Sequence, residues 1–507
     1  MRDKLRALAS DTAVYGVSTI VQRFLTFMLT PLYTNYLTMS ELGVVSNIYA
    51  LIAFVNILYA CGFESAFMRF YRGTDSEKRI VFTQSFLPVV IVSALLSLLF
   101  FLARSVSTPF TGLPSATDSS EFALILSIPF LDALTIIPFA LLRMERRAAR
   151  FAVFKIIVVI LNIILNVILV VYYKMGSHGV FVAGACSSLL AVILVAPIIM
   201  KSLERGISRL KELTSFGIPT IPSGFASMLL QVADRPILTA MTTPIIVGLY
   251  NANYRLAIPM MLCVSVFEYA WKPFYLHHAD DKDASVLFGR IFTYFTLVSA
   301  TVFFMISVFA PLIVQIPFPG GTLIHASYWQ GLHIVPIVAA AYFFAGVTSN
   351  LAAGLHITKN TKQLPLIVGL AAVVNIILNL ILIPTMSYTG AAWATLGGYL
   401  VSAGFMYTSS QRVYKVHYEW GRVGVIVALA VVFLQADIYL CSHEIISKLM
   451  AEFTPTSSSG LVILLVIKTS LLLLFGVSLT LARVVSNSGD GAGQNVSLWS
   501  LFRRRKA

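Results

Sequence analysis

The segment Asn162-Ile-Ile-Leu-Asn166-Val-Ile-Leu returns later in the chain as Asn375-Ile-Ile-Leu-Asn379-Leu-Ile-Leu. The two copies share seven of eight residues at an offset of 213, and each lies inside a long apolar segment. A repeat at this spacing predicts that the chain contains two similar halves. The alternative is a chance match between two apolar helices that both contain Asn, and the surrounding sequence tests it.

Shorter patterns near the start of each copy repeat in the same order. Glu41-Leu-Gly-Val-Val matches the pattern of Ile246-Val-Gly-Leu-Tyr, and Phe70-Tyr71 matches Phe274-Tyr275. The offsets run only from 204 to 213 over this stretch, which argues against chance. We therefore predict two repeated halves followed by an additional C-terminal segment.

The composition indicates that most of the chain is surrounded by lipid. Of its 507 residues, 58% are apolar and only 11% are charged, whereas about 25% are charged in a typical soluble protein. The apolar segments are about 20 residues long, which is the length of a helix that crosses a bilayer. We predict an all-α, polytopic membrane protein with fourteen transmembrane helices, at residues 12–34, 42–68, 80–103, 121–143, 151–173, 179–200, 214–240, 245–270, 287–313, 330–354, 364–386, 388–410, 421–441 and 459–482.

Basic residues are concentrated on one side of these spans. The termini and alternate connecting segments hold 29 of the 36 Lys and Arg residues, while the opposite loops hold only Arg104, Lys174 and Lys448. Because cytoplasmic loops of membrane proteins carry the excess of positive charge, both termini are predicted to be cytoplasmic. The net charge of +14 thus follows from membrane topology, and no nucleic-acid partner is expected. The first apolar segment lacks a small-residue cleavage site and is predicted to remain as a span.

Six spans in each half give the two halves the same orientation, because six is even. We predict an N-terminal lobe at residues 1–205, a C-terminal lobe at 206–413, and two further helices with a basic cytoplasmic tail at 414–507. Parallel repeats of this kind are typical of transporters, whose substrate path runs between the lobes.

The loops leave little room for catalytic chemistry. None is longer than about 20 residues, and neither a phosphate-binding P-loop nor a nucleophile elbow occurs. The four cysteines lack the spacing of metal ligands. We expect a protein that is not an enzyme and that needs no metal or cofactor.

Ionisable residues inside the predicted spans mark candidate functional positions, since each is costly in lipid. At about 1.5 Å of rise per residue, Arg23 in the span 12–34 and Arg255 in the span 245–270 both reach the membrane midplane. Asp132 and Lys468 are similarly deep, whereas Asp234 and Arg235 lie in the outer part of the span 214–240 and Asp437 lies near the outer end of 421–441.

Helical periodicity arranges polar residues of the leading helices into stripes. In the span 12–34 the stripe contains Thr19, Arg23, Thr26, Thr30 and Tyr33, spaced by four and three residues. Corresponding stripes in the second half contain Ser223, Ser227, Gln231, Asp234, Asn251 and Arg255. We predict that the stripes face each other across a cavity with a cationic centre. Alternatively, a structural acid such as Asp132 or Asp234 neutralises each arginine.

The chain resembles the multidrug, oligosaccharidyl-lipid and polysaccharide exporter superfamily over nearly its whole length, and most closely the polysaccharide flippases of the O-antigen (Wzx) type. The resemblance rests on the fourteen spans, the doubled halves, the paired Asn segments, and the phrases Pro31-Leu-Tyr-Thr-Asn35 and Leu249-Tyr-Asn-Ala-Asn253. It implies a flippase of the bacterial inner membrane that moves a polyprenyl-diphosphate-linked oligosaccharide to the outer leaflet by alternating access. Its partners would be this glycan, membrane lipid and other polysaccharide-assembly proteins.

The resemblance also implies roles for individual residues. The related lipid II flippases carry essential arginines in their first and eighth helices, and Arg23 and Arg255 occupy comparable helices here. The last two helices of that branch line a groove for the lipid tail, which would bring Lys468 near the diphosphate.

Physical chemistry supports an anionic substrate for these stripes. Arg offers a planar fork that suits phosphate oxygens, and we expect Arg23, Arg255, Arg235 and Lys468 to bind the diphosphate. Sugar hydroxyls need polar partners, and the candidates are Gln22, Gln231 and Asn251. Asp132 and Asp234 are candidates for binding a coupling ion, or else they neutralise nearby basic residues.

The Asn residues of the repeat have a different predicted role. Asn162 and Asn166, like Asn375 and Asn379, are four residues apart on apolar helices. We predict that they form hydrogen bonds between helices within each lobe.

Two other functions stay open. An ion-coupled multidrug antiporter of the same superfamily would have twelve spans and an acid-rich site, whereas the deep charges here are mainly basic. A membrane-embedded glycan polymerase or ligase would have a large outer loop with catalytic residues, which this sequence lacks.

Overall fold

The computed structural model describes residues 20, 21, 23–104, 111–113, 119–206, 209–442 and 458–481. The chain forms two compact units, Met1–Ala279 with Ile313–Lys415, and Asp280–Leu312 with Val416–Ala507. Regular structure in the described residues is helical except for a short hairpin of β1 (Pro317–Phe318) and β2 (Gly321–Thr322). The prediction of an all-α protein is therefore confirmed.

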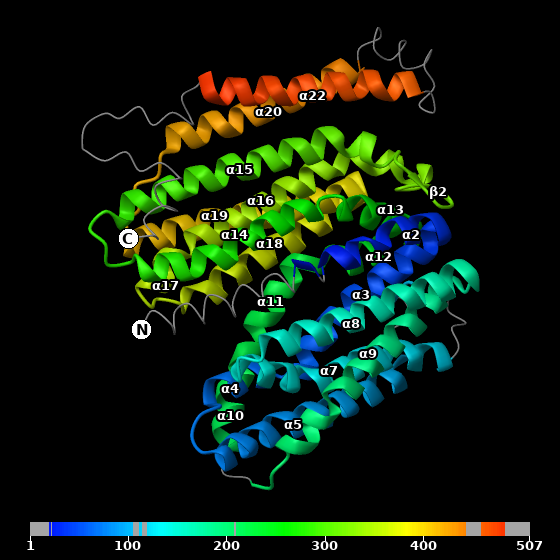
Figure 1. The fold of residues 1–507 in the computed structure, drawn as a ribbon, viewed down its shortest axis with the longest axis vertical. Coiled ribbons are helices and arrows are strands. Elements are labelled where there is room, and N and C mark those ends of the chain that lie inside the picture. The colour runs from blue at the N-terminus through cyan, green and yellow to red at the C-terminus, as the bar shows by residue number, and fades with distance from the viewer. Residues whose placement is uncertain are drawn as a thin grey trace. The chain divides into compact units, whose positions relative to one another are not determined.

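The N-terminal half of the first unit is a bundle in which α7 packs against α5 and α9, and α3 packs against α7 (Figure 1). A core of Phe67, Phe82, Ala133 and Ile137 fills this bundle. Its elements are α2 (Leu29–Tyr36), α3 (Met39–Ala60), α4 (Phe63–Phe70), α5 (Asp75–Leu102), α7 (Ser119–Met144), α8 (Ala148–Asn166), the π-helical η1 (Val167–Tyr172) and α9 (Gly176–Ser202).

The remainder of the first unit is a second bundle, in which α19 packs against α18 and α16, and α14 packs against α16. Its elements are α10 (Leu210–Gly217), η2 (Ile218–Thr220), α11 (Ile221–Val232), α12 (Asp234–Met241), α13 (Pro244–Arg255), α14 (Ile258–His277), η3 (Ala326–Ile334), α16 (Val335–Leu351), α17 (Ala353–Ile357), α18 (Gln363–Met386) and α19 (Tyr388–Val413).

Local sequence explains where the first helices begin and end. Thr38 and Glu41 form a reciprocal capping box at the start of α3, which satisfies backbone N–H groups that have no helical partner. The predicted span 42–68 is interrupted, because Cys61 and Gly62 adopt left-handed backbone conformations and separate α3 from α4. Gly62 packs so closely on α10 that a Cβ there would lie 2.0 Å from the Gly217 carbonyl oxygen.

The two bundles meet where α3 crosses α13. Gly43 of α3 lies against the backbone of Pro244, and Gly248 of α13 lies against the backbone of Met39. Gly43 and Gly248 are 205 positions apart, and so are Met39 and Pro244, which is the offset between Glu41 and Ile246 in the repeated pattern around them. The crossing is therefore formed by equivalent positions of the two repeats.

The Asn segments form the same hydrogen bonds in both halves. Asn166 Nδ2 donates to the Asn162 carbonyl oxygen at 2.8 Å and to its Oδ1 at 3.2 Å, and Asn379 makes the same two bonds to Asn375 at 2.9 and 3.2 Å. The first Asn of each pair then donates to the next helix, to Ser187 Oγ and to the Ala394 carbonyl oxygen. The predicted bonding between helices within each half is confirmed.

The second compact unit contains α15 (Ala284–Ile313), α20 (Trp420–Ser442) and α22 (Ser458–Leu481). Phe304 of α15, Ile426 of α20 and Phe475 of α22 share one apolar cluster. The sequence repeat assigns α15 to the second half, whereas compactness groups it with the last two helices. The boundaries 1–205, 206–413 and 414–507 thus stay predictions about the repeat.

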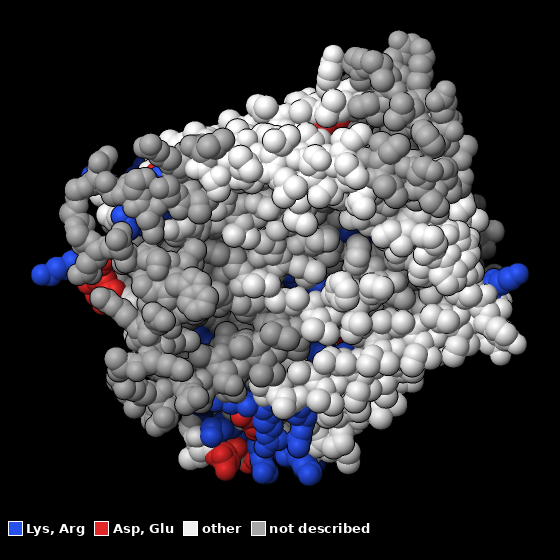
Figure 2. Space-filling view, turned by 45° about the horizontal axis from the view of Figure 1, so that its top comes forward, with Lys and Arg blue, Asp and Glu red and all other residues white. Residues whose placement is uncertain are grey.

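The chain is a multi-pass membrane protein. Within the described residues, ten helical segments are long and apolar enough to cross a bilayer, and the predicted number of fourteen is compatible with the other helices. Large apolar side chains such as Leu87, Ile91 and Leu95 lie exposed along α5, as expected of a surface that faces lipid. Figure 2 likewise shows that most described side chains visible on one face are uncharged.

Candidate functional site

Residues 23–36, which are helical apart from a turn at Met28 and include α2, form the first helix and contact α13 and α14 through both predicted arginines. Arg255 Nη1, at the end of α13, donates to Thr30 Oγ1 at 3.4 Å, and Arg23 Nη1 donates to Ser265 Oγ of α14 at 2.9 Å. These contact points are seven residues apart on the first helix, which corresponds to about 10 Å along a helix axis. The structure therefore brings both arginines to the same helix pair but at different levels.

Arg255 is half-buried among hydroxyl and aromatic groups. Its guanidinium carbon lies 5.9 Å from the centre of the Tyr33 ring. The Tyr33 hydroxyl donates to Asn166 Oδ1 at 2.9 Å, which ties the first helix to the repeated Asn pair. Within the described part of the chain, no carboxylate pairs with Arg255. Its positive charge is thus available to an anionic ligand.

Arg23 has an acidic neighbour that sequence reasoning did not select. Glu268 of α14 interacts electrostatically with Arg23, and Ser349 of α16 is another neighbour of this carboxylate. Glu268 follows Ser265 by three residues on α14, so both share a helix face and the periodicity contained the signal for this residue. The exposed side chain of Arg23 is only partly neutralised.

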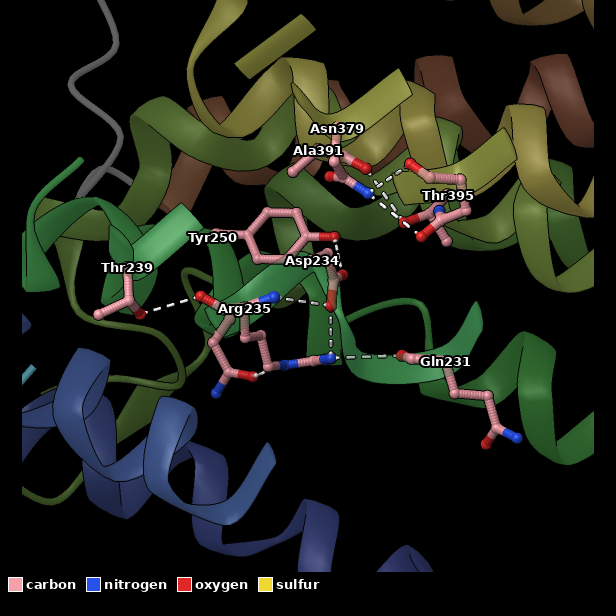
Figure 3. Close-up of polar contacts among 10 residues, drawn as sticks. Gln231, Asp234, Arg235, Thr239, Tyr250, Asn379, Ala391 and Thr395 are labelled. Carbon is pink, nitrogen blue, oxygen red and sulfur yellow. Dashed lines mark hydrogen bonds and ion pairs between the residues drawn. The ribbon is translucent and has the colours of Figure 1, made fainter. Parts of the chain in front are cut away.

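Asp234 is buried at the centre of a polar network (Figure 3). One carboxylate oxygen accepts from the Arg235 backbone N–H at 2.9 Å and from Arg235 Nη1 at 3.1 Å. The other accepts from the Tyr250 hydroxyl of α13 at 2.5 Å. Both oxygens of Asp234 are therefore already occupied by partners from the same bundle.

Arg235 is held on every side by its own half of the chain. Its Nη1 also contacts the Gln231 carbonyl oxygen at 3.4 Å, its Nε contacts Asn251 Oδ1 at 3.4 Å, and its guanidinium carbon lies 4.5 Å from the Tyr254 ring centre. This arrangement suits a residue that positions its neighbours. Among the described residues Asn251 Nδ2 is buried without a hydrogen-bond partner, and the exposed Gln231 side chain donates only to the Ser227 carbonyl oxygen, so both amides can serve a ligand.

Asp132 forms a separate cluster inside the N-terminal bundle. Its Oδ1 accepts from Ser188 Oγ of α9 at 2.7 Å, and its basic neighbour is Lys155 of α8. Lys155 Nζ lies 4.2 Å from the centre of the Phe139 ring. A lysine, and not an arginine of the stripes, is thus the basic partner of Asp132.

Lys468 and Gln22 are the remaining residues of the predicted site. Lys468 lies in the second unit, where its Nζ donates to both oxygens of Asp437 at 2.9 and 3.1 Å, and both side chains are buried. Gln22 lies outside the described residues. Among the residues whose positions are described, no group of three or more His, Cys, Asp or Glu side chains could hold a metal ion.

Residues 8–274, more than half of the chain, match the protein family described as "Polysaccharide biosynthesis protein". The chain belongs to this family. No curated protein matches the chain.

Solved structures place this member of the polysaccharide biosynthesis family among known transporter folds. A structure described as lipid II flippase MurJ in an inward closed conformation matches with a TM-score of 0.72 and 15% identity, over 93% of this chain and 100% of that one. An inward-facing MATE-family multidrug transporter of the MOP superfamily matches with a TM-score of 0.60 and 14% identity, over 80% and 96% of the two chains. The MATE transporter DinF-BH in complex with R6G matches at 0.54 and 16%, over 81% and 96%. The family member therefore has the fold of the MOP superfamily.

Proposed function

We propose that this protein is a flippase for a lipid-linked oligosaccharide in the synthesis of a cell-surface polysaccharide. Its substrate would be carried by a polyprenyl diphosphate and would move from the cytoplasmic to the outer leaflet by alternating access. The proposal includes a location in the bacterial inner membrane with both termini in the cytoplasm. It is supported by the family match and by the transporter fold.

The uncompensated positive charge of Arg255 is the observation that carries the proposal. A half-buried arginine without a carboxylate partner in the described chain lies at the contact between the two halves. Burying a charge in this way is costly unless a ligand pairs with it. A diphosphate supplies two negative charges, and its oxygens match the fork of a guanidinium group.

The two arginines make their contacts at different positions along the first helix, and this difference suggests an order of binding. In the proposed orientation Arg23 lies nearer the cytoplasm, and its exposed side chain would meet the diphosphate first. Arg255 would hold it deeper, beside the hydroxyl groups of Thr30 and Tyr33. The amides of Gln231 and Asn251 would then hydrogen-bond to sugar hydroxyls, while Arg235 keeps Asn251 in place.

A multidrug antiporter is the second candidate, because the chain also shares its fold with MATE transporters. An antiporter that selects cationic compounds would need an acidic site. The uncompensated charge in this site is positive, which favours an anionic substrate.

The test is a strain from which this gene is deleted. Mass spectrometry of extracted lipids should show accumulation of a diphosphate-linked oligosaccharide, with loss of the surface polysaccharide. The wild-type protein should restore export, and so should an Arg412→Ala control, because Arg412 is exposed and distant from the site in sequence. Normal surface glycan in the deletion strain, together with increased sensitivity to cationic drugs, would favour the antiporter.

A further inference from the structure

An open cavity of about 500 Å³ lies in the N-terminal bundle and shares no residue with the site described above. It is formed where α5 and α8 begin and where α7 and α9 end. Apolar side chains line part of it: Phe82, Leu141, Pro197 and Ile198. Charged side chains line the rest: Lys78, Arg79, Arg147, Arg150 and Lys201, with Asp75 and Glu145.

Two of the basic residues are neutralised within the cavity. Lys78 Nζ lies 3.4 Å from Asp75 Oδ1, and Arg147 Nε lies 3.1 Å from Glu145 Oε2. The Tyr71 hydroxyl also donates to Glu145. The pKa of Tyr71 is raised well above its usual range, mainly by burial and next by the neighbouring Glu145 carboxylate. This hydroxyl therefore remains a donor. Both acids of the cavity are therefore occupied.

The other three basic residues keep their charge uncompensated. In the described parts of the chain, Arg79, Arg150 and Lys201 have no carboxylate partner, and all three are exposed. Lys and Arg side chains gather at the lower edge of Figure 2, the end at which α5 begins and α9 ends in Figure 1. A cavity with three uncompensated positive charges attracts an anion.

The apolar lining distinguishes between sources of that anion. A free phosphate has no apolar group that could pack against Phe82, Leu141 or Ile198, whereas the glycerol and first methylene groups of a phospholipid would contact them. The cavity also lies at the ends of helices with lipid-facing apolar surfaces, which is the level of headgroups. Basic pockets in such positions bind anionic headgroups.

We propose that this cavity binds the headgroup of an anionic phospholipid, with Arg79, Arg150 and Lys201 around the phosphate and the apolar residues against its glycerol end. This inference does not depend on the transported substrate. It adds a lipid site within one bundle that is separate from the transport path.

The test is titration of the purified full-length protein in detergent with phosphatidylglycerol, read by native mass spectrometry. The triple variant Arg79→Gln, Arg150→Gln, Lys201→Gln should bind the lipid roughly 100-fold more weakly. The matched triple Lys359→Gln, Lys362→Gln, Arg412→Gln, which removes three exposed charges outside the cavity, should bind it as the wild type does. A variant with Arg79→Lys and Arg150→Lys keeps the charge and should retain binding, which guards against a folding defect in the Gln variant.

Three outcomes would overturn the proposal. The first is equal loss of binding in the cavity and control variants. The second is binding of phosphatidylcholine as strong as that of phosphatidylglycerol. The third is displacement of the lipid by millimolar inorganic phosphate, which would identify a free anion as the occupant.

Discussion

Gly43 and Gly248 contact each other's helices in the same way. A Cβ on Gly43 would lie 1.8 Å from the Pro244 carbonyl oxygen, and a Cβ on Gly248 would lie 2.0 Å from the Met39 carbonyl oxygen. Neither distance is possible for a real side chain, so α3 and α13 can cross this closely only because both positions are Gly. Gly43 with Gly248, and Met39 with Pro244, are each separated by the repeat offset of 205, so both repeats contribute equivalent residues to the crossing.

Alanine at either glycine should therefore push α3 and α13 apart. We expect Gly43→Ala or Gly248→Ala to lower the free energy of unfolding by about 1 to 3 kcal/mol, the usual cost of overpacking. Thermal unfolding in detergent measures the effect. Gly369→Ala and Gly404→Ala are matched controls, because nothing lies within 4 Å of a Cβ at either position, and they should not destabilise the protein. Equal stability of all four variants would mean that the crossing is looser than described.

Arg255 and Arg23 should be needed for export under the proposed function. We expect Arg255→Ala and Arg23→Ala to abolish surface glycan while the protein still accumulates in the membrane, because the diphosphate loses its cationic partner. Lysine at either position keeps the charge without the fork, so partial export is expected. Immunoblots of membranes and quantified surface glycan give the result, and normal export in both Ala variants would mean that the arginines are structural.

Asp234 should contribute to stability through its partners. Asp234→Asn leaves the buried Arg235 without its counterion, and we expect a loss of about 3 to 5 kcal/mol. The double variant Asp234→Asn, Arg235→Gln should be more stable than the single one. Tyr250→Phe removes one hydrogen bond to Asp234 and should cost less, about 1 to 3 kcal/mol.

Ion coupling through Asp132 or Asp234 requires a separate measurement. Transport in vesicles with an imposed pH or sodium gradient should respond to the gradient in the parent protein. Since both oxygens of Asp234 are occupied, we expect a stable Asp132→Asn variant to lose more of the response than a stable Asp234→Asn variant. An unchanged response in both variants would place the coupling site elsewhere.

Lys468 should act through Asp437. Lys468→Met alone removes the ion pair of the buried Asp437 carboxylate and should strongly destabilise the protein, whereas Lys468→Met with Asp437→Leu replaces the pair by apolar groups and should restore stability. We expect this double variant to export glycan. A double variant that folds but fails to export would instead support the diphosphate-binding role implied by the family resemblance.

The charge distribution predicts membrane topology. A reporter that is active only in the cytoplasm should work when fused after Arg147, Glu204 or Thr361, and it should fail after Gly112 or Gly320. A reversed result at two or more of these positions would exclude the predicted orientation and number of spans.

Sequence by itself determined the features that depend on short segments of chain. Apolar length determines which segments are helices, because backbone groups in lipid must bond within their own segment. The i, i+4 spacing of Asn162 and Asn166, and of Asn375 and Asn379, already determines the bonds within each pair, since such residues share a helix face. Sequence comparison also revealed the repeat that relates Gly43 to Gly248.

Only the tertiary structure decided which polar groups meet. The pairing of Tyr250 with Asp234, and of Lys468 with Asp437, depends on how whole helices pack. The contacts of Arg23 and Arg255 join residues more than 220 positions apart. Glu268 of α14 is likewise brought to Arg23 only by the packing of separate helices. Periodicity can place a residue on a helix face, but the partner of that face is chosen by side-chain volumes and helix positions summed over the whole bundle.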